Sequence, residues 1–136
     1  MKVLIDTSVW SLALRRRPRV ENEEVVRELA GLVDDGRVVM IGPVRQELLS
    51  GLRERAQFER LREHLRAFRD LELTSDDYEE AALAYNRCRS KGIQGSNTDF
   101  LICAVAIRRE LSIFTTDEDF GTYSRLLPIA LHEIAT

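Results

Sequence analysis

The stretch Val3-Leu4-Ile5-Asp6-Thr7-Ser8-Val9-Trp10 decides the fold of this chain. Its apolar and β-branched start predicts a strand that is buried on both faces, and the apolar run ends at the carboxylate of Asp6. A lone acid at the end of a buried strand costs free energy unless a helix N-terminus, a hydrogen-bond donor or a metal ion satisfies it. We therefore expect Asp6 to have partners, and other acids that follow strands are the candidates.

Composition describes an ordinary globular chain of 136 residues with a net charge of −3, and we expect a single domain over residues 1–136. Because the net charge is negative, the protein as a whole has no positive electrostatic field that would indicate nucleic-acid binding. Local positive patches matter more for such binding than the net charge does. Cys88 and Cys103 lack metal-type spacing, which predicts buried thiols in a reducing cytoplasm. No signal segment precedes the first strand and no apolar run spans a bilayer, so we expect a cytoplasmic protein without membrane contact.

Strands and helices alternate along the chain. Strands are predicted at residues 3–5, 38–41 and 112–115, with shorter ones at 71–73 and 129–131. Helical patterns cover residues 11–17, 21–35, 56–68, 74–88 and 96–107, and Pro43 opens a further helix that carries Glu47. This alternation predicts an α/β fold with a mainly parallel central sheet and helices on both faces.

The segment from Ser96 to Ile107 has the clearest helix signals. Ser96 and Asp99 fit a capping box, and the helix that follows is apolar nearly all round. We expect it to be the central buried helix. Asp76 and Asp77 start the preceding helix, where acids favour the positive end of the helix dipole, so no chemistry is assigned to them.

Several acids share one property: each directly follows a strand or lies in the first turns of a helix. They are Asp6, Glu47, Asp99, Asp117 and Asp119. In a parallel α/β sheet such segments meet at the carboxyl edge of the strands, where ligands bind. Clustered carboxylates repel one another unless a cation lies among them, and an all-oxygen site selects Mg²⁺ or Mn²⁺ over zinc. Such a site commonly handles phosphate groups.

Most of these acids also have a structural explanation when each is taken alone. Asp99 fits a helix cap, Glu47 fits an exposed helical position, and Asp117 and Asp119 fit a turn. Asp6 has the weakest structural explanation. Because acids follow three separate predicted strands, the pattern as a whole favours one shared site.

The motifs resemble one known family when they are taken in order. They are L-I-D-T-S at residues 4–8, V-x-x-E-L-x-x-G at 44–51, S-x-x-D-x-x-I-C-A-V-A at 96–106 and T-x-D-x-D-F at 115–120. This order resembles PIN-domain ribonucleases, in particular the VapC toxins of VapBC toxin–antitoxin pairs. The resemblance covers essentially the whole chain and implies a three-layer α/β/α domain.

The resemblance also implies an Mg²⁺- or Mn²⁺-dependent endoribonuclease that acts on tRNA or rRNA, forms a homodimer and is inhibited by a small VapB-type antitoxin. By position, Asp6, Glu47, Asp99 and Asp117 match the four acids of the family. Asp119 matches an additional acid found in many members, and Thr7 or Ser8 together with Thr115 match hydroxyls that support the acids. Because an acidic pocket repels RNA, nearby basic residues are candidate RNA contacts: Arg15, Arg16, Arg17, Arg87, Arg89 and Lys91.

Other functions stay open at this point. A haloacid-dehalogenase-type phosphohydrolase needs a second Asp two residues after Asp6, but Ser8 occupies that position. A receiver domain needs a Lys after a late strand, but no Lys follows the strand predicted at 112–115. A non-catalytic domain that binds a structural metal or an arginine-rich partner is a further alternative. Within the same fold, a PIN-type nuclease that acts in RNA processing without an antitoxin is the runner-up.

Overall fold

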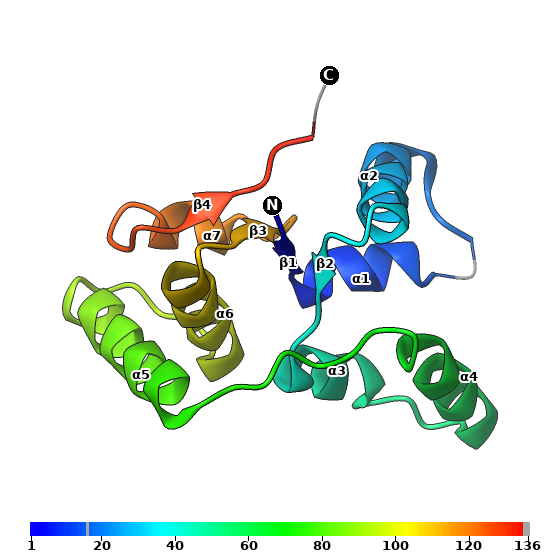
Figure 1. Cartoon of the computed structure of the whole chain (residues 1–136), viewed down its shortest axis with the longest axis horizontal. Coiled ribbons are helices and arrows are strands. Elements are labelled where there is room, and N and C mark those ends of the chain that lie inside the picture. The colour runs from blue at the N-terminus through cyan, green and yellow to red at the C-terminus, as the bar shows by residue number, and fades with distance from the viewer. Residues whose placement is uncertain (16, 135–136) are drawn as a thin grey trace.

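The computed structural model describes residues 1–15 and 17–134, and within them four parallel strands form one sheet (Figure 1). The strands are β1 (Val3–Ile5), β2 (Val38–Val39), β3 (Ser112–Phe114) and β4 (Ala130–Leu131), in the order β2-β1-β3-β4. Each neighbouring pair is parallel. The predicted parallel sheet is therefore confirmed, with the first strand at its centre.

The central strand β1 is buried on both faces, as its apolar sequence predicts. Val3, Leu4 and Ile5 are each 0% exposed, and Ile5 is in register with Phe114 of β3. The Asp6 amide still donates to the Phe114 carbonyl at 2.9 Å. The backbone of Asp6 is thus held by the sheet at the point where the strand ends.

Helices cover both faces of this sheet (Figure 1). On one side lie α5 (Ser75–Ser90) and α6 (Asn97–Arg109), which pack against each other. On the other side lie α1 (Thr7–Ala13) and α2 (Glu23–Asp34). The helix α3 (Gly42–Leu49) packs against α1, and α4 (Arg55–Leu65) packs against α3. A 3₁₀ turn, η1 (Val20–Asn22), precedes α2, and the short helix α7 (Asp119–Tyr123) follows β3. The expected three-layer α/β/α architecture is confirmed.

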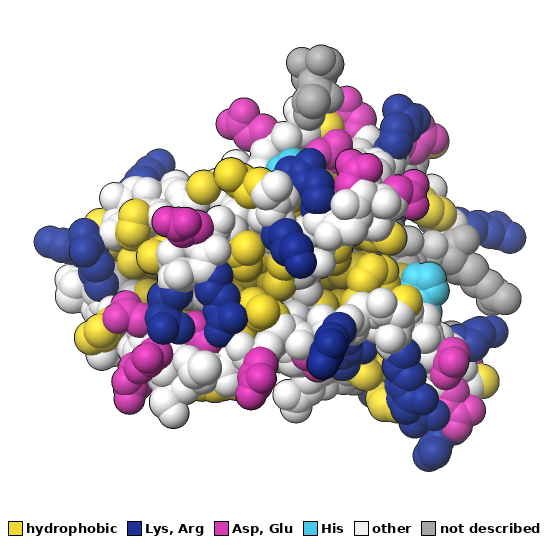
Figure 2. All heavy atoms as spheres, in the orientation of Figure 1, with side chains coloured by type: hydrophobic (Ala, Val, Ile, Leu, Met, Phe, Trp, Pro, Cys, Tyr) yellow, Lys and Arg dark blue, Asp and Glu magenta, His cyan; other side chains and the backbone are white. Residues whose placement is uncertain are grey.

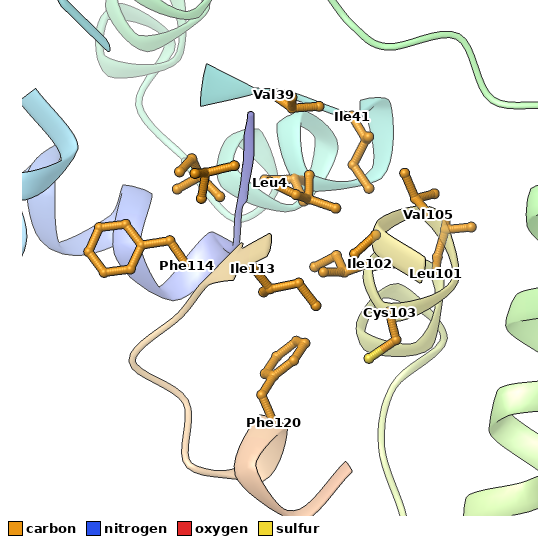
Figure 3. Close-up of a cluster of buried hydrophobic side chains, with 14 of the residues drawn as sticks. Leu4, Val39, Ile41, Leu101, Ile102, Cys103, Val105, Ile113, Phe114 and Phe120 are labelled. Atoms are coloured by element: carbon orange, nitrogen blue, oxygen red, sulfur yellow. The ribbon is translucent and has the colours of Figure 1, made fainter. Parts of the chain in front are cut away.

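The central helix of the core is α6. Its residues from Phe100 to Ala106 are all buried, and Ile102 points toward Ile113 of the sheet (Figure 3). Cys103 on this helix and Cys88 on α5 are buried free thiols. The prediction of a central buried helix is confirmed, and α6 fixes the position of Asp99 in its first turn.

A buried ion cluster joins α5 to α6. Asp77, 0% exposed, accepts hydrogen bonds from Arg108 at 2.5 Å and Arg109 at 2.8 Å, and also from the Thr74 amide at 2.8 Å. Burial alone would raise the pKa of Asp77, but the Thr74 amide and the two guanidinium groups lower it to about 2. Asp77 therefore has a structural role beyond the expected interaction with the helix dipole.

Some element boundaries differ from the sequence-based prediction. The first helix begins at Thr7, not at residue 11, because the Asp6 carbonyl accepts the Val9 and Trp10 amides. The second strand ends at Val39, and the strand predicted at 71–73 is absent: Met40 and Asp70 form only an isolated bridge. The fourth helix ends at Leu65, because Arg45 donates to the Leu65 and Phe68 carbonyls.

None of the helices in the described ranges has the length and apolar character needed to cross a membrane.

Candidate functional site

Asp6 is the buried centre of the site. Its residue is 4% exposed, and its Oδ2 accepts two hydrogen bonds of 2.7 Å, one from Ser8 Oγ and one from Thr115 Oγ1. Within residues 1–15 and 17–134, no donor contacts the other oxygen, Oδ1. The two hydroxyls therefore orient the carboxylate and leave one of its oxygens free for a ligand.

The same hydroxyls connect the ends of β1 and β3. Ser8 Oγ accepts the Thr116 amide at 3.0 Å, and Thr115 Oγ1 accepts the Asp117 amide at 3.0 Å. Asp117 Oδ1 in turn accepts the Asp119 amide at 2.9 Å, which shapes the start of α7. This chain of hydrogen bonds brings Asp117 to the edge of the sheet where Asp6 lies.

Asp99 reaches the site from the first turn of α6. Its amide donates to Ser96 Oγ at 3.0 Å, so the predicted helix cap is present. Its side-chain Oδ2 accepts a 2.8 Å hydrogen bond from the hydroxyl of Tyr123. Capping is thus performed by the Asp99 backbone and Ser96, and the Asp99 carboxylate is available for another role.

The charges of Asp6 and Asp117 act on Asp99. Burial raises the pKa of Asp99, and the negative charges of Asp6 and Asp117 raise it further, while hydrogen bonds from Tyr123 and Ser96 oppose the shift. In the part of the chain that the structure describes, no Lys, Arg or His forms a salt bridge with these three carboxylates. The site therefore concentrates negative charge that protein cations do not neutralise.

Two further predicted acids, Glu47 and Asp119, are exposed. Glu47 is exposed on α3, and it makes no side-chain hydrogen bond or salt bridge to any residue that the structure describes. Asp119 is exposed at the start of α7. Burial and the hydrogen bond to Asp99 raise the pKa of Tyr123, and the negative charge of Asp119 adds to that shift. The structure thus brings Asp6, Asp99 and Asp117 together and leaves Glu47 without a contact to them.

The supporting hydroxyls also separate into two kinds. Ser8 and Thr115 contact Asp6 directly. The hydroxyl of Thr7 is buried and has no hydrogen-bond partner among residues 1–15 and 17–134. Of the alternatives Thr7 and Ser8, the geometry favours Ser8.

The residues present fit a hard divalent cation by their chemistry. All donors at the site are carboxylate and hydroxyl oxygens, and the unneutralised charge favours a cation. In the present arrangement of the described residues, no group of three or more His, Cys, Asp or Glu side chains is close enough to hold one ion. Mg²⁺ is usually bound through one or two carboxylates and several waters, so this spacing is compatible with it.

The predicted RNA-contact residues are placed unequally. Arg15, Arg17, Arg87, Arg89 and Lys91 are exposed, and Arg16 lies outside the described residues. Arg89 donates to the Tyr85 hydroxyl at 3.2 Å, and the Tyr85 ring packs on Phe100 beside Asp99. Arg87 lines a different groove with Ala104 and Leu127. On the face of the molecule that Figure 2 shows, the Lys and Arg side chains of the described residues are interspersed with Asp and Glu.

Sequence comparison assigns the family. A model of the PIN domain matches residues 3–126. The chain belongs to the PIN-domain family. It is 31% identical over 126 residues to VapC ribonuclease Mb1587 of Mycobacterium bovis and to ribonuclease VapC11 of Mycobacterium tuberculosis. In both cases 91% of this chain aligns with 92% of the relative.

Solved structures share the fold of this PIN domain. VapBC2 from Rickettsia felis, bound to a DNA fragment from its promoter, superposes with a TM-score of 0.78 at 17% identity, covering 97% of this chain and 98% of that one. FitAcB from Neisseria gonorrhoeae superposes with a TM-score of 0.75 at 24% identity, covering 96% of both chains. These similarities support the observed α/β/α arrangement.

Sequence reasoning missed Tyr123 as a contact of Asp99. Its only signal in the sequence is its position four residues after Asp119 in the same short helix. The contact depends on how α7 folds back onto α6.

Proposed function

We propose that this PIN-domain protein is an Mg²⁺- or Mn²⁺-dependent endoribonuclease and the toxin of a type II toxin–antitoxin pair. The observation that carries the proposal is the placement of Asp6, Asp99 and Asp117 at one edge of the sheet, where no described Lys, Arg or His forms a salt bridge with them. Burial raises the pKa of Asp99, and the charges of Asp6 and Asp117 raise it further. The VapC ribonucleases at 31% identity over most of the chain support the same activity.

Asp6 and Asp99 are the proposed main metal ligands, and Asp117, Glu47 and Asp119 complete the site directly or through water. When bound, the ion activates a water molecule and neutralises the charge that develops on the phosphate. Ser8 and Thr115 hold Asp6 in one orientation, which reduces the rearrangement needed before reaction.

Water, not the ribose 2′-hydroxyl, is the proposed nucleophile. Glu47 and Asp117 are the candidates to orient it for in-line attack. The bond that breaks is then the one between phosphorus and the 3′-oxygen, so the products carry a 5′-phosphate and a 3′-hydroxyl.

The proposed partners follow from the family and from charge. The substrate is an RNA, tRNA or rRNA, and exposed Arg15, Arg17, Arg89 and Lys91 are suited to contact its phosphates. A small VapB-type antitoxin is the proposed inhibitor, because VapBC complexes are among the structures with this fold. We also propose a homodimer, which analytical ultracentrifugation tests directly.

The primary test is cleavage of purified tRNA and rRNA with Mg²⁺ or Mn²⁺, with and without EDTA. Asp6→Asn and Asp99→Asn are expected to lower the cleavage rate roughly 100-fold or more, because metal-ion catalysis supplies several kcal/mol. Asp35→Asn, a change at an exposed acid at the end of α2, is the matched control. Cleavage that survives EDTA, or that is retained in both site variants, contradicts the proposal.

The second candidate is a PIN-type nuclease that works in RNA processing without an antitoxin. Expression of the chain together with its neighbouring small open reading frame separates the two. Relief of growth inhibition by that frame supports the toxin, whereas a chain that does not inhibit growth supports a processing nuclease.

A further inference from the structure

Tyr123 is a buried tyrosine whose hydroxyl points at a carboxylate of the site. The residue is 0% exposed, and its ring lies between Phe100, at a centroid distance of 4.9 Å, and Phe120, at 5.2 Å. Its hydroxyl donates to Asp99 Oδ2 at 2.8 Å. Because the two phenylalanine rings hold the tyrosine ring, its hydroxyl has a fixed position.

Gly95 provides the space for this hydroxyl. A Cβ atom at Gly95 would lie 2.3 Å from the Tyr123 hydroxyl oxygen, and 2.9 Å from both Tyr123 Cζ and Phe100 Cε2. Its φ is not in the positive range, unlike those of Gly36, Gly51 and Gly92. The glycine is therefore required by close approach and not by backbone conformation.

Asp6 and Asp99 are held in the same way. The hydroxyls of Ser8 and Thr115 both donate to Oδ2 of Asp6, and the hydroxyl of Tyr123 donates to Oδ2 of Asp99. In each carboxylate one oxygen is occupied by hydroxyl donors, and the other remains available to a ligand. The donors of Asp6 come from the first turn of α1 and from the residue after β3, whereas the donor of Asp99 comes from α7.

We propose that Tyr123 is a positioning residue for Asp99 and that Gly95 exists to admit it. Tyr123 orients the carboxylate so that Oδ1 faces the metal, and it acts on the reaction only through Asp99. This inference rests on the proposed nuclease function. It gives Tyr123, at the end of α7 and outside the acidic motifs, a role in orienting a metal ligand.

Tyr123→Phe tests the proposal because it removes one oxygen atom and keeps the ring. We expect Mn²⁺ binding, measured by calorimetry in the absence of RNA, to weaken about 10-fold, the usual effect of losing a hydrogen bond to a metal ligand. We expect kcat for RNA cleavage to fall by a similar factor while KM for RNA stays unchanged. Tyr78→Phe, which removes the same atom from an exposed tyrosine of α5, is the control.

Gly95→Ala provides a second, independent route to the same contact. The added methyl group displaces the Tyr123 hydroxyl, so Mn²⁺ binding is expected to weaken as in Tyr123→Phe. In the double variant the effects are expected to be smaller than the product of the single effects, because both act on one hydrogen bond.

The outcomes separate the two levels of inference. Wild-type Mn²⁺ affinity and kcat in a folded Tyr123→Phe variant overturn the role of Tyr123 and leave the nuclease proposal intact. A wild-type protein that neither binds Mn²⁺ nor cleaves RNA overturns both. A Tyr123→Phe variant that loses only thermal stability, with metal affinity unchanged, also overturns the positioning role.

Discussion

At the residue scale, the orientation of Asp6 depends on two hydroxyls that donate to one oxygen. Each of them also accepts a backbone amide: Ser8 accepts that of Thr116, and Thr115 accepts that of the site residue Asp117. Thr115→Val keeps the shape of the side chain and removes both hydrogen bonds. We expect RNA cleavage to fall about 10-fold and the free energy of unfolding to fall by about 1–2 kcal/mol. Initial-rate assays and urea denaturation measure the two effects.

Thr7→Val is the comparison for that change, since the Thr7 hydroxyl is buried without a partner among the described residues. Removing an unsatisfied buried hydroxyl is expected to leave stability unchanged or raise it by about 1 kcal/mol. An equal loss of cleavage in Thr7→Val and Thr115→Val contradicts the assignment of Thr115 as the supporting residue.

At the element scale, the Asp77 cluster fixes α5 against α6 and therefore fixes Asp99. The pKa of Asp77 in the folded protein is about 2, against 3.8 for an ordinary Asp, so its contribution to stability is fully present above pH 4. It is lost as the pH falls from about 4 to 2, and it amounts to about 2 kcal/mol. We expect chemical denaturation across this range to show the loss in the wild type and a smaller loss in Asp77→Asn.

The adjacent variant Asp76→Asn serves as the control for that experiment. Asp76 is 72% exposed at its side chain and lies 3.6 Å from Arg108. Exposed ion pairs contribute about 0–1 kcal/mol, so its pH profile should follow that of the wild type. A profile of Asp77→Asn that coincides with the wild type would show that the cluster does not stabilise the fold.

Arg45 fixes a second pair of elements. Its guanidinium donates to the Leu65 carbonyl at 3.0 Å, to the Phe68 carbonyl and to Asp70 at 2.9 Å, which joins α3 to the end of α4. Arg45→Lys keeps the charge but loses the forked geometry. We expect the free energy of unfolding to fall by about 1–3 kcal/mol in urea titrations. An unchanged urea midpoint in Arg45→Lys contradicts a stabilising role for the forked hydrogen bonds of the Arg45 guanidinium.

The elements also show how far sequence reasoning reaches in this fold. The strand β1 and the helix α6 were predictable because each buries a continuous apolar run beside a clear polar boundary, at Asp6 and at Ser96. The prediction of a strand at 71–73 was wrong, because parallel pairing in this part of the chain is limited to the single Met40–Asp70 bridge. Strand extent depends on neighbouring backbone hydrogen bonds that local composition does not encode.

Prediction of the site divides in the same way. Asp6, Asp99 and Asp117 could be predicted to lie at the same edge of the sheet, because the carboxyl ends of parallel strands and the starts of the helices that follow them gather there. Tyr123 and the difference between Thr7 and Ser8 were not predictable, since both depend on tertiary packing around the carboxylates. Whether Glu47 takes part stays a prediction, because it contacts none of the other acids.

At the scale of the whole molecule, the acidic site opposes folding in the absence of metal. Burial and the charges of Asp6 and Asp117 raise the pKa of Asp99, so ionised Asp99 costs stability at neutral pH. Metal-free Asp99→Asn is therefore expected to have a higher Tm than metal-free wild type, by roughly 2–4 °C for each kcal/mol of relieved repulsion. Calorimetric scans in EDTA measure this difference.

Divalent metal should reverse that order. An ion that binds only the folded protein stabilises it in proportion to the logarithm of its concentration above Kd. We expect the Tm of the wild type to rise with Mn²⁺ while that of Asp99→Asn changes little. The plots of Tm against Mn²⁺ concentration for the two proteins should therefore cross. Because Ca²⁺ also binds carboxylates but prefers a larger coordination shell, it controls for nonspecific screening. Parallel curves for the two proteins contradict the placement of Asp99 at the metal.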